Sequence, residues 1–364
     1  MGECKLGDVL ELKYGKDHKA LSDGNIPVYG SGGIMRYADT FLYDKESILI
    51  PRKGTLNNIF YLNGEQPFWT VDTIFWSKIN TELTFGKFLF YYLKTIDFAN
   101  LNVGSAVPSL TTKVLNEVDI LLPPLKEQKA IAQVLSSLDD KIDLLHCQNK
   151  TLEEMAQTLF RQWFIEEAKD EWEEKPLSEI ASFLNGLACQ KFPPKNDVDK
   201  LPVLKIKDLK AGISESSDWA TTDVKPEYII KSGDVIFAWS ASLIVKIWDG
   251  EKCILNQHLF KVTSEDYPKW FYYQWCKYHL DRFIAIAQAH ATTMGHIKRK
   301  DLDNAMCFVP SKNEIKTMDE QIAPLMQKLE NNSKQIKTLE NMRDTLLPKL
   351  MNGEVKIQLI DKGK

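Results

Sequence analysis

The stretch that decides the fold is Asn149-Lys150-Thr151-Leu152-Glu153-Glu154-Met155, which returns in the second half of the chain as Ile336-Lys337-Thr338-Leu339-Glu340-Asn341-Met342. The same offset relates Leu138 to Leu325 and Pro123 to Pro310. Self-similarity at a fixed spacing indicates that one structural plan has been used twice. We therefore predict two similar globular modules, each followed by a similar long helix, in an order that closes on itself with approximate twofold symmetry.

The two repeated segments lie on predicted helices whose apolar residues recur in steps of three and four, the pattern of a heptad seam. Asn149 and Asn332 are polar interruptions of this seam. A seam so long and narrow predicts that the helices pair as an antiparallel coiled coil; the alternative is that each helix packs only on its own module. At ~1.5 Å per residue, about 40 residues would make a rod of roughly 60 Å. The predicted seam residues are Leu135, Leu138, Ile142, Leu145, Leu152 and Leu159 in the first helix, and Ile322, Leu325, Leu329, Ile336, Leu339 and Leu346 in the second.

Both modules read as mixtures of strands and short helices. Asp234–Phe237 matches the apolar run Ser47–Ile50, and Asn256–Phe260 matches Val71–Phe75; β-branched and aromatic residues of this kind favour strands. The predicted fold class is therefore mixed α/β, with two similar α/β domains separated by two long helices. The predicted parts are a first globular domain over 1–124, a helical region over 125–168, a second globular domain over 169–312, a second helical region over 313–355 and a tail over 356–364.

Composition favours a soluble protein of two domains. Hydrophobic residues make up 44% and charged residues 26% of the 364 residues, and no apolar stretch approaches the length of a membrane span. The N-terminus has no apolar signal core, which predicts a cytoplasmic protein. The six cysteines are scattered, which favours free thiols over a disulfide framework or a zinc site. The net charge of −4 argues that any nucleic acid would be held by local positive groups or with help from partner subunits.

Catalytic motifs are missing from the sequence. Gly30-Ser31-Gly32-Gly33 is not followed by Gly-Lys-Ser/Thr, and neither a Walker loop nor a dinucleotide fingerprint occurs. His290 and His296 have no third ligand at metal spacing. Glu314-Ile315-Lys316 resembles the end of a nuclease motif but lacks a suitably placed upstream aspartate. We therefore expect a non-catalytic chain with no metal and no cofactor of its own.

Four stretches resemble the specificity subunit of a Type I restriction–modification enzyme, and the resemblance covers nearly the whole chain. The helix start after Pro123-Pro124 is the most specific of them, while the second copy lacks the second proline and the glutamine. The stretches are Ile50-Pro51-Arg52-Lys53-Gly54-Thr55, Phe68-Trp69-Thr70-Val71-Asp72-Thr73-Ile74-Phe75, Leu122-Pro123-Pro124-Leu125-Lys126-Glu127-Gln128 and Leu135-Ser136-Ser137-Leu138-Asp139-Asp140-Lys141-Ile142.

This resemblance implies that each domain reads one half of an asymmetric, interrupted site on double-stranded DNA. It implies that the helices set the spacing and dock two modification (methyltransferase) subunits, which use S-adenosylmethionine to methylate adenine. Restriction (translocase and nuclease) subunits would add the chemistry that depends on ATP and Mg²⁺. No membrane is implied.

Polar loops flanked by basic residues are what base readout in the major groove requires. Because these loops differ between the modules, we expect two different half-sites. The candidate DNA-binding residues are Arg36, Arg52, Lys53, Ser105, Ser109 and Thr111 in the first module, and Lys205, Lys207, Trp239, Ser240, His290, Thr292, Thr293, His296, Lys298 and Arg299 in the second.

Two other classes of protein remain as alternatives. A stand-alone bipartite DNA-binding regulator would bind its operator tightly without partner subunits. A fused methyltransferase or nuclease would need the cofactor loop and catalytic motifs that the sequence lacks. Co-purification with a methyltransferase-like subunit separates the specificity subunit from the regulator.

Overall fold

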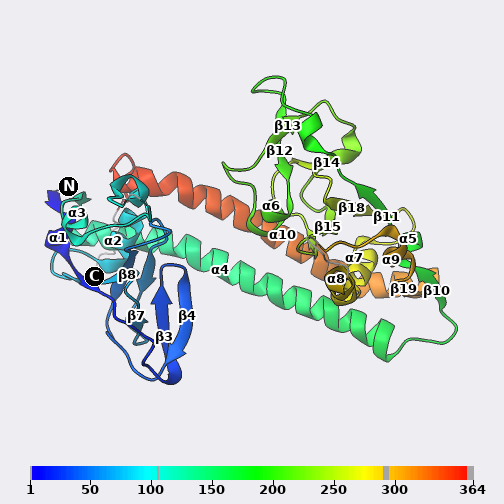
Figure 1. Cartoon of the computed structure of the whole chain (residues 1–364), viewed down its shortest axis with the longest axis horizontal. Helices are drawn as coiled ribbons and strands as arrows, with labels where there is room; N and C mark the ends of the chain where they lie inside the picture. The colour runs from blue at the N-terminus through cyan, green and yellow to red at the C-terminus, as the bar shows by residue number, and fades with distance from the viewer. Residues whose placement is uncertain (1, 105, 290–294, 359–364) are drawn as a thin grey trace. The chain divides into compact units, whose positions relative to one another are not determined.

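The computed structural model of the chain describes residues 2–104, 106–289 and 295–358 (Figure 1). The chain divides into two compact units, one formed by Met1–Asp143 with Thr338–Lys364 and the other by Leu144–Lys337. The long helices are α4 (Leu125–Arg161), which continues into a π-helical turn (Gln162–Glu166), and α10 (Lys312–Met351). Each unit therefore contains one globular module, the beginning of the helix that follows it and the end of the other helix.

The described part of the first module contains a two-stranded, a four-stranded and a three-stranded sheet. Strand β1 (Gly2–Lys5) pairs antiparallel with β9 (Asp119–Leu122) beside the start of α4. The four-stranded sheet has the order β2 (Leu10–Tyr14), β8 (Ile74–Ile79), β5 (Ser47–Pro51), β6 (Phe60–Leu62). The three-stranded sheet has the order β4 (Gly33–Ala38), β3 (Asp23–Gly30), β7 (Trp69–Thr70). The helices are α1 (Leu6–Val9), α2 (Gly86–Leu93), α3 (Thr112–Asn116) and a 3₁₀ turn at Phe98–Leu101.

The second module repeats this plan. Strand β10 (Glu173–Pro176) pairs antiparallel with β19 (Met306–Val309). Its sheets have the orders β11 (Ser182–Asn185), β18 (Leu259–Thr263), β15 (Val235–Ala238), β16 (Ile244–Ile247) and β13 (Trp219–Thr221), β12 (Lys200–Leu204), β17 (Cys253–Leu255), β14 (Ile229–Ile230). The helices are α5 (Leu177–Ile180), α6 (Ile206–Ala211), α7 (Lys269–Tyr278), α8 (Leu280–Ala289) and α9 (Arg299–Asp303), with 3₁₀ turns at Cys189–Lys191 and Pro226–Tyr228.

Strand register confirms that the modules are two copies of one design. Ile50 of β5 lies opposite Phe75 of β8, and Phe237 of β15 lies opposite Phe260 of β18. Successive side chains of a strand point to opposite faces. Accordingly, Ile48 and Ile50 join one core cluster with Leu89, whereas Leu49 packs in another cluster with Phe68 and Trp76. The strand β5 is thus buried on both faces, which explains its uninterrupted apolar sequence.

The two long helices run antiparallel within each unit. In the first unit, Ile131 near the start of α4 shares a core cluster with Leu350 and Met351 at the end of α10. In the second unit, Phe160 near the end of α4 shares a cluster with Ile322, near the start of α10. Opposite ends of the helices therefore meet in both units, as the heptad pattern predicted.

All predicted seam residues are covered to some degree. The ends of the helices also enter the module cores: the Phe160 ring packs edge-on against Trp275 of α7 at 5.0 Å between centroids. Packing of each helix on its own module alone is therefore excluded. Buried seam residues are Leu135, Ile142, Leu145, Ile322, Leu329 and Ile336, and half-buried ones are Leu138, Leu152, Leu159, Leu325, Leu339 and Leu346.

The six cysteines are free thiols, as expected, and four of them (Cys189, Cys253, Cys276 and Cys307) are buried. Within the described residues, no helix combines the length and apolar character that crossing a membrane requires. Across the same residues, histidine, cysteine and carboxylate side chains form no group of three that could hold a metal ion.

Candidate nucleic-acid interface

Two chain segments of the first module meet at the end of strand β5. The backbone N–H of Gly54 donates to the Pro108 carbonyl oxygen at 3.1 Å, and that of Leu110 donates to the Arg52 carbonyl oxygen at 2.9 Å. Between these bonds, Lys53 lies opposite Ser109 in an antiparallel bridge. We call residues 52–54 and 108–110 the first clasp. It brings the predicted residues Arg52, Lys53 and Ser109 together.

The second module contains the same backbone arrangement at the positions that the repeat offset predicts, so that position 239 corresponds to 52 and position 296 to 109. The Ala241 N–H donates to the Gly295 carbonyl oxygen at 2.8 Å, and the Ile297 N–H donates to the Trp239 carbonyl oxygen at 3.1 Å. Ser240 lies opposite His296 in an antiparallel bridge. We call residues 239–241 and 295–297 the second clasp. It brings Trp239, Ser240 and His296 together.

The clasps share an unusual backbone angle as well as their hydrogen bonds. Gly54 has φ +89°, and Ala241, at the equivalent position, has φ +57°. A left-handed conformation costs an alanine on the order of 1 kcal/mol, whereas glycine adopts it freely. The second module therefore keeps the clasp geometry despite this cost, and such strain concentrates at functional sites.

Arg52 of the first clasp lies beside the exposed ring of Tyr14. Arg52 Nη1 donates to the Asp72 carbonyl oxygen at 2.9 Å, and the guanidinium carbon lies 5.4 Å from the centre of the Tyr14 ring. Tyr14 is 53% exposed and packs edge-on against Phe75 at 5.1 Å. The result is a planar cation supported by an aromatic ring at the end of the sheet.

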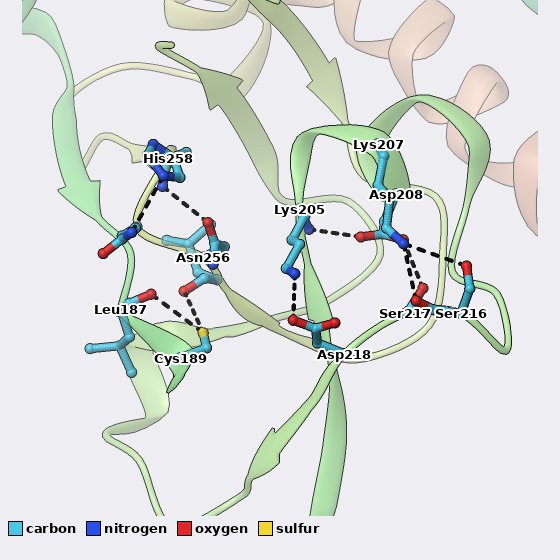
Figure 2. A network of polar contacts seen from close by, with 12 residues as sticks. Leu187, Cys189, Lys205, Lys207, Asp208, Ser216, Ser217, Asp218, Asn256 and His258 are labelled. Atoms are coloured by element: carbon cyan, nitrogen blue, oxygen red, sulfur yellow. Dashed lines mark hydrogen bonds and ion pairs between the residues drawn. The ribbon is translucent and has the colours of Figure 1, made fainter. Parts of the chain in front are cut away.

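The second clasp presents different side chains from the same positions. Trp239 Nε1 donates to Asn185 Oδ1 at 3.1 Å, and its ring stacks on Phe260 at 5.6 Å between centroids. Ser240 Oγ and His258 Nδ1 are hydrogen-bonded at 3.1 Å. Figure 2 shows His258 next to Asn256, whose Oδ1 accepts from the His258 N–H at 3.3 Å. This clasp therefore presents an indole ring and a hydroxyl group, with the side-chain amides of Asn185 and Asn256 close by.

Lys205 and Lys207 are engaged within the second module (Figure 2). The Lys205 ammonium pairs with Asp218, and Lys207 Nζ donates to the Ser216 carbonyl oxygen at 3.0 Å. Both lysines thus contact acceptors of their own module in this structure, and their role in DNA binding stays a prediction.

Arg36 and Thr111 also have local structural roles. Arg36 Nη2 donates to Asp23 Oδ1 at 2.6 Å and to the Leu21 carbonyl oxygen at 3.1 Å, which ties the start of β3 to β4. Thr111 caps α3 by accepting from the Val114 N–H at 3.3 Å. These contacts give both residues a local structural role, and their contact with DNA stays a prediction.

Lys298 and Arg299 lie exposed at the start of α9, directly after the second clasp. Arg299 Nη2 donates weakly to the Phe183 carbonyl oxygen at 3.4 Å. Ser105, His290, Thr292 and Thr293 lie outside the described residues.

Sequence reasoning missed Tyr14 and Asn185. Both are the last residues of equivalent strands, opposite Phe75 in β8 and Phe260 in β18. They lie closer together in the sequence than the repeat offset would place them, because the loops between the strands differ in length. Phe75 and Phe260 occupy matching positions in the sequence, and this match could have been used to align Tyr14 with Asn185.

The chain belongs to the family of Type I restriction–modification specificity subunits. The family model described as the Type I restriction modification DNA specificity domain matches residues 1–154 and 169–341, once for each module. Among its relatives is the MjaIX specificity subunit of Methanocaldococcus jannaschii, 30% identical over 304 residues that cover 75% of this chain and 69% of that protein. The HindI specificity subunit of Haemophilus influenzae is 20% identical over 365 residues, covering 76% of this chain and 79% of the relative.

The fold matches a solved structure over nearly its full length. The crystal structure of the S subunit of the Type I restriction–modification system from M. genitalium superposes with a TM-score of 0.62 and covers 96% of each chain at 16% identity. At this identity the comparison shows a shared fold.

Proposed function

We propose that the chain is the DNA-recognition subunit of a Type I restriction–modification complex, in which each module reads one half of an asymmetric, interrupted site. The observation that carries this proposal is the pair of clasps. They share backbone hydrogen bonds, bridge and left-handed residue, yet present Arg52 and Lys53 in one module and Trp239 and Ser240 in the other.

Base readout requires polar side chains that are fixed by the backbone and exposed at a loop edge. The major groove presents a distinct donor and acceptor pattern for each base pair. Two frames of identical geometry with unlike side chains would therefore select unlike sequences. This predicts a bipartite target whose halves differ.

The paired helices would set the distance between the half-sites. Core clusters hold α4 against α10 in both units, and a helix lengthens by a fixed rise per residue. The gap between half-sites should therefore follow the length of the helices.

Two equivalent docking points for modification subunits would lie on the outer faces of the helices. Met155 of α4 is 48% exposed and Met342 of α10 is 47% exposed, and they occupy the same position in the repeat. Exposed methionines suit adaptable apolar contacts with a partner. Bound subunits would also supply phosphate contacts that a chain of net charge −4 lacks.

The chemistry would reside on those partners. S-adenosylmethionine would bind to the modification subunits, and ATP with Mg²⁺ would bind to the restriction subunits. This chain would contribute sequence selection and geometry without taking part in bond making.

Mapping modified adenines in the source genome, with and without this chain, tests the proposal. Modified sites should form one bipartite motif that disappears when the chain is deleted. A chain carrying both Trp239→Ala and His296→Ala should alter one half of the motif and leave the other half intact. Modification that persists without the chain, or a change in both halves, would refute the assignment of one half-site to each module.

A further inference from the structure

Building on the proposed function, we infer that one equivalent pair of positions in each module selects one base pair. In the first module Arg52, supported by Tyr14, selects guanine; in the second module Asn185, held by Trp239, selects adenine. Tyr14 and Asn185 end equivalent strands, and Arg52 and Trp239 follow equivalent strands. The same two equivalent positions therefore form the base-contacting pair in both modules. In the first module Arg52 contacts the base and Tyr14 supports it, whereas in the second module Asn185 contacts the base and Trp239 supports it.

The guanidinium of Arg52 is prepared for a bidentate contact. One of its nitrogens, Nη1, donates to the Asp72 carbonyl oxygen, and within the described part of the chain its other donors have no hydrogen-bond acceptor. The Tyr14 ring lies beneath the guanidinium group, with 5.4 Å between its centre and the guanidinium carbon, and supports it by a cation–π contact. Arginine presents parallel N–H groups that match O6 and N7 of guanine, a match that the single ammonium of lysine does not offer.

The orientation of the Asn185 amide is set by Trp239. An indole N–H can only donate, so the atom that accepts from Trp239 Nε1 at 3.1 Å has to be the carbonyl oxygen of the amide. The amide nitrogen, with two donors, and the second lone pair of Oδ1 remain for a ligand. An exposed amide in this state offers one donor and one acceptor, the pair that adenine N7 and N6 require.

Trp239 acts here as a positioning residue. Its ring stacks on Phe260 and lies edge-on to His296 at 6.3 Å between centroids, and its backbone forms part of the second clasp. The ring contacts restrain the indole, and the indole N–H in turn orients the Asn185 amide.

The test measures base preference one position at a time. The full chain, assembled with the modification subunits of the same system, is assayed for adenine methylation on duplexes in which each base pair of the mapped site is varied. Arg52→Lys keeps the positive charge but removes the parallel N–H donors of the guanidinium group. Asn185→Asp keeps the shape of the side chain but removes the two amide N–H donors. Lys45→Gln, an exposed cation before the opposite end of β5, is the control for a change of charge.

We expect Arg52→Lys to reduce discrimination roughly tenfold or more at a single G·C pair in one half-site. Asn185→Asp should do the same at a single A·T pair in the other half-site, while Lys45→Gln changes neither. Trp239→Phe should weaken preference at the same A·T pair as Asn185→Asp, an effect that loss of folding would not confine to one position. Melting temperatures identify a variant that fails to fold, and Asn185→Ser then replaces Asn185→Asp.

Unchanged preference in Arg52→Lys and Asn185→Asp would overturn the inference while leaving the proposed function intact. A change spread over every position of a half-site would overturn it as well. Failure of the proposed function has a different signature, because the mapped motif would then not depend on this chain.

Discussion

Arg343 of α10 donates from Nη1 to Asp139 Oδ1 of α4 at 2.9 Å, with both side chains about one-quarter exposed. Tyr91 Oη of α2 donates to the other oxygen of the same carboxylate at 2.6 Å. One carboxylate thus joins both long helices to the first module. Burial and the bond to Asp139 also raise the pKa of Tyr91 well above its ordinary value, so its hydroxyl remains a donor at any physiological pH.

Arg343→Met should lower the free energy of unfolding by about 2 kcal/mol, because it leaves a largely covered carboxylate without its counter-charge. Urea denaturation measures the loss. Lys150→Met is the matched control, since its pair with Glu154 is exposed at 4.0 Å and should contribute less than about 0.5 kcal/mol. Equal losses in the two variants would show that the Arg343–Asp139 contact contributes no more to the free energy of unfolding than an exposed ion pair does.

Asn149→Leu should raise the free energy of unfolding by about 1 kcal/mol, because it replaces a polar seam residue that has an unsatisfied buried atom with an apolar one. Asn149 Nδ2 donates to Ser333 Oγ at 3.2 Å, but its buried Oδ1 has no partner among the described residues. Ser333 retains its bond to the Leu329 carbonyl oxygen at 3.0 Å. A loss of stability in thermal melts would mean that the hydrogen bond to Ser333 stabilises the fold by more than the unsatisfied Asn149 Oδ1 destabilises it.

Glu314→Gln should flatten the dependence of stability on pH in acid. Glu314 accepts from Lys169 Nζ at 2.6 Å and forms a capping box with Ser311 at the start of α10. The bond to Lys169, followed by those to Ser311, lowers the pKa of Glu314 to about 2. Because the folded-state pKa lies below the unfolded one, this stability is present above pH ~4.3 and is lost as pH falls towards 2.

Denaturant midpoints measured between pH 5 and pH 2 check this prediction. Glu320→Gln, an exposed change on the same helix, should leave the acid slope as it is in the unaltered chain. An identical slope in Glu314→Gln would contradict it. Glu314 of the stretch Glu314-Ile315-Lys316 thus has a capping role at the start of α10.

Gly186→Ala should destabilise the second module by about 2 kcal/mol or more and weaken selection at its half-site. A Cβ at Gly186 would lie 2.2 Å from the Asn256 carbonyl oxygen, a backbone atom that cannot move alone. Gly15→Ala should act equally on the first module, where the Cβ would lie 2.0 Å from the Val71 carbonyl oxygen. Gly32→Ala, with no atom within 4 Å, is the control. Calorimetry and methylation assays provide the two measurements.

Inserting one heptad into α4 after Asp143 and one into α10 after Lys337 should lengthen the helix pair by roughly 10 Å while keeping the seam in phase. The gap between half-sites should then grow by about three base pairs, since a base step is ~3.4 Å. Methylation mapping reads the new gap, and the same heptad inserted after Lys356 is the control. A gap of unchanged length would disprove the role of the helices in spacing.

The helices and the pairing of the clasps follow from the sequence because both rest on a constant offset. Apolar residues in heptad steps form a narrow stripe, which a second helix can bury in few ways. Residues 52–54 and 239–241 occupy equivalent positions in the repeat. Lys205 and Arg36 behave differently. Their acceptors, Asp218 and Asp23, lie 13 residues away in each case, and only the path of the intervening loop brings them together. Sequence pattern shows a cation but not the acceptor that already binds it.

The packing of Phe160 and Phe164 in the core of the second module also depends on tertiary contacts that the sequence pattern does not show. Both residues lie outside the predicted seam, each next to or close to the seam residue Leu159, and their rings enter the cluster that contains Trp270 and Trp275. Tertiary packing, rather than helix periodicity, decides where they lie.

The packing of Phe160 and Phe164 in the second module affects where genes of this kind can recombine. A crossover placed where a globular module begins would separate Phe160 and Phe164 from the tryptophans they pack against, and the hybrid would inherit a mismatched interior. A crossover within the middle of the helices, between Asp143 and Leu144 and again near Lys337, would transfer each interior whole. Recombination within the two helices would therefore exchange one module for another while keeping the interior of each unit intact.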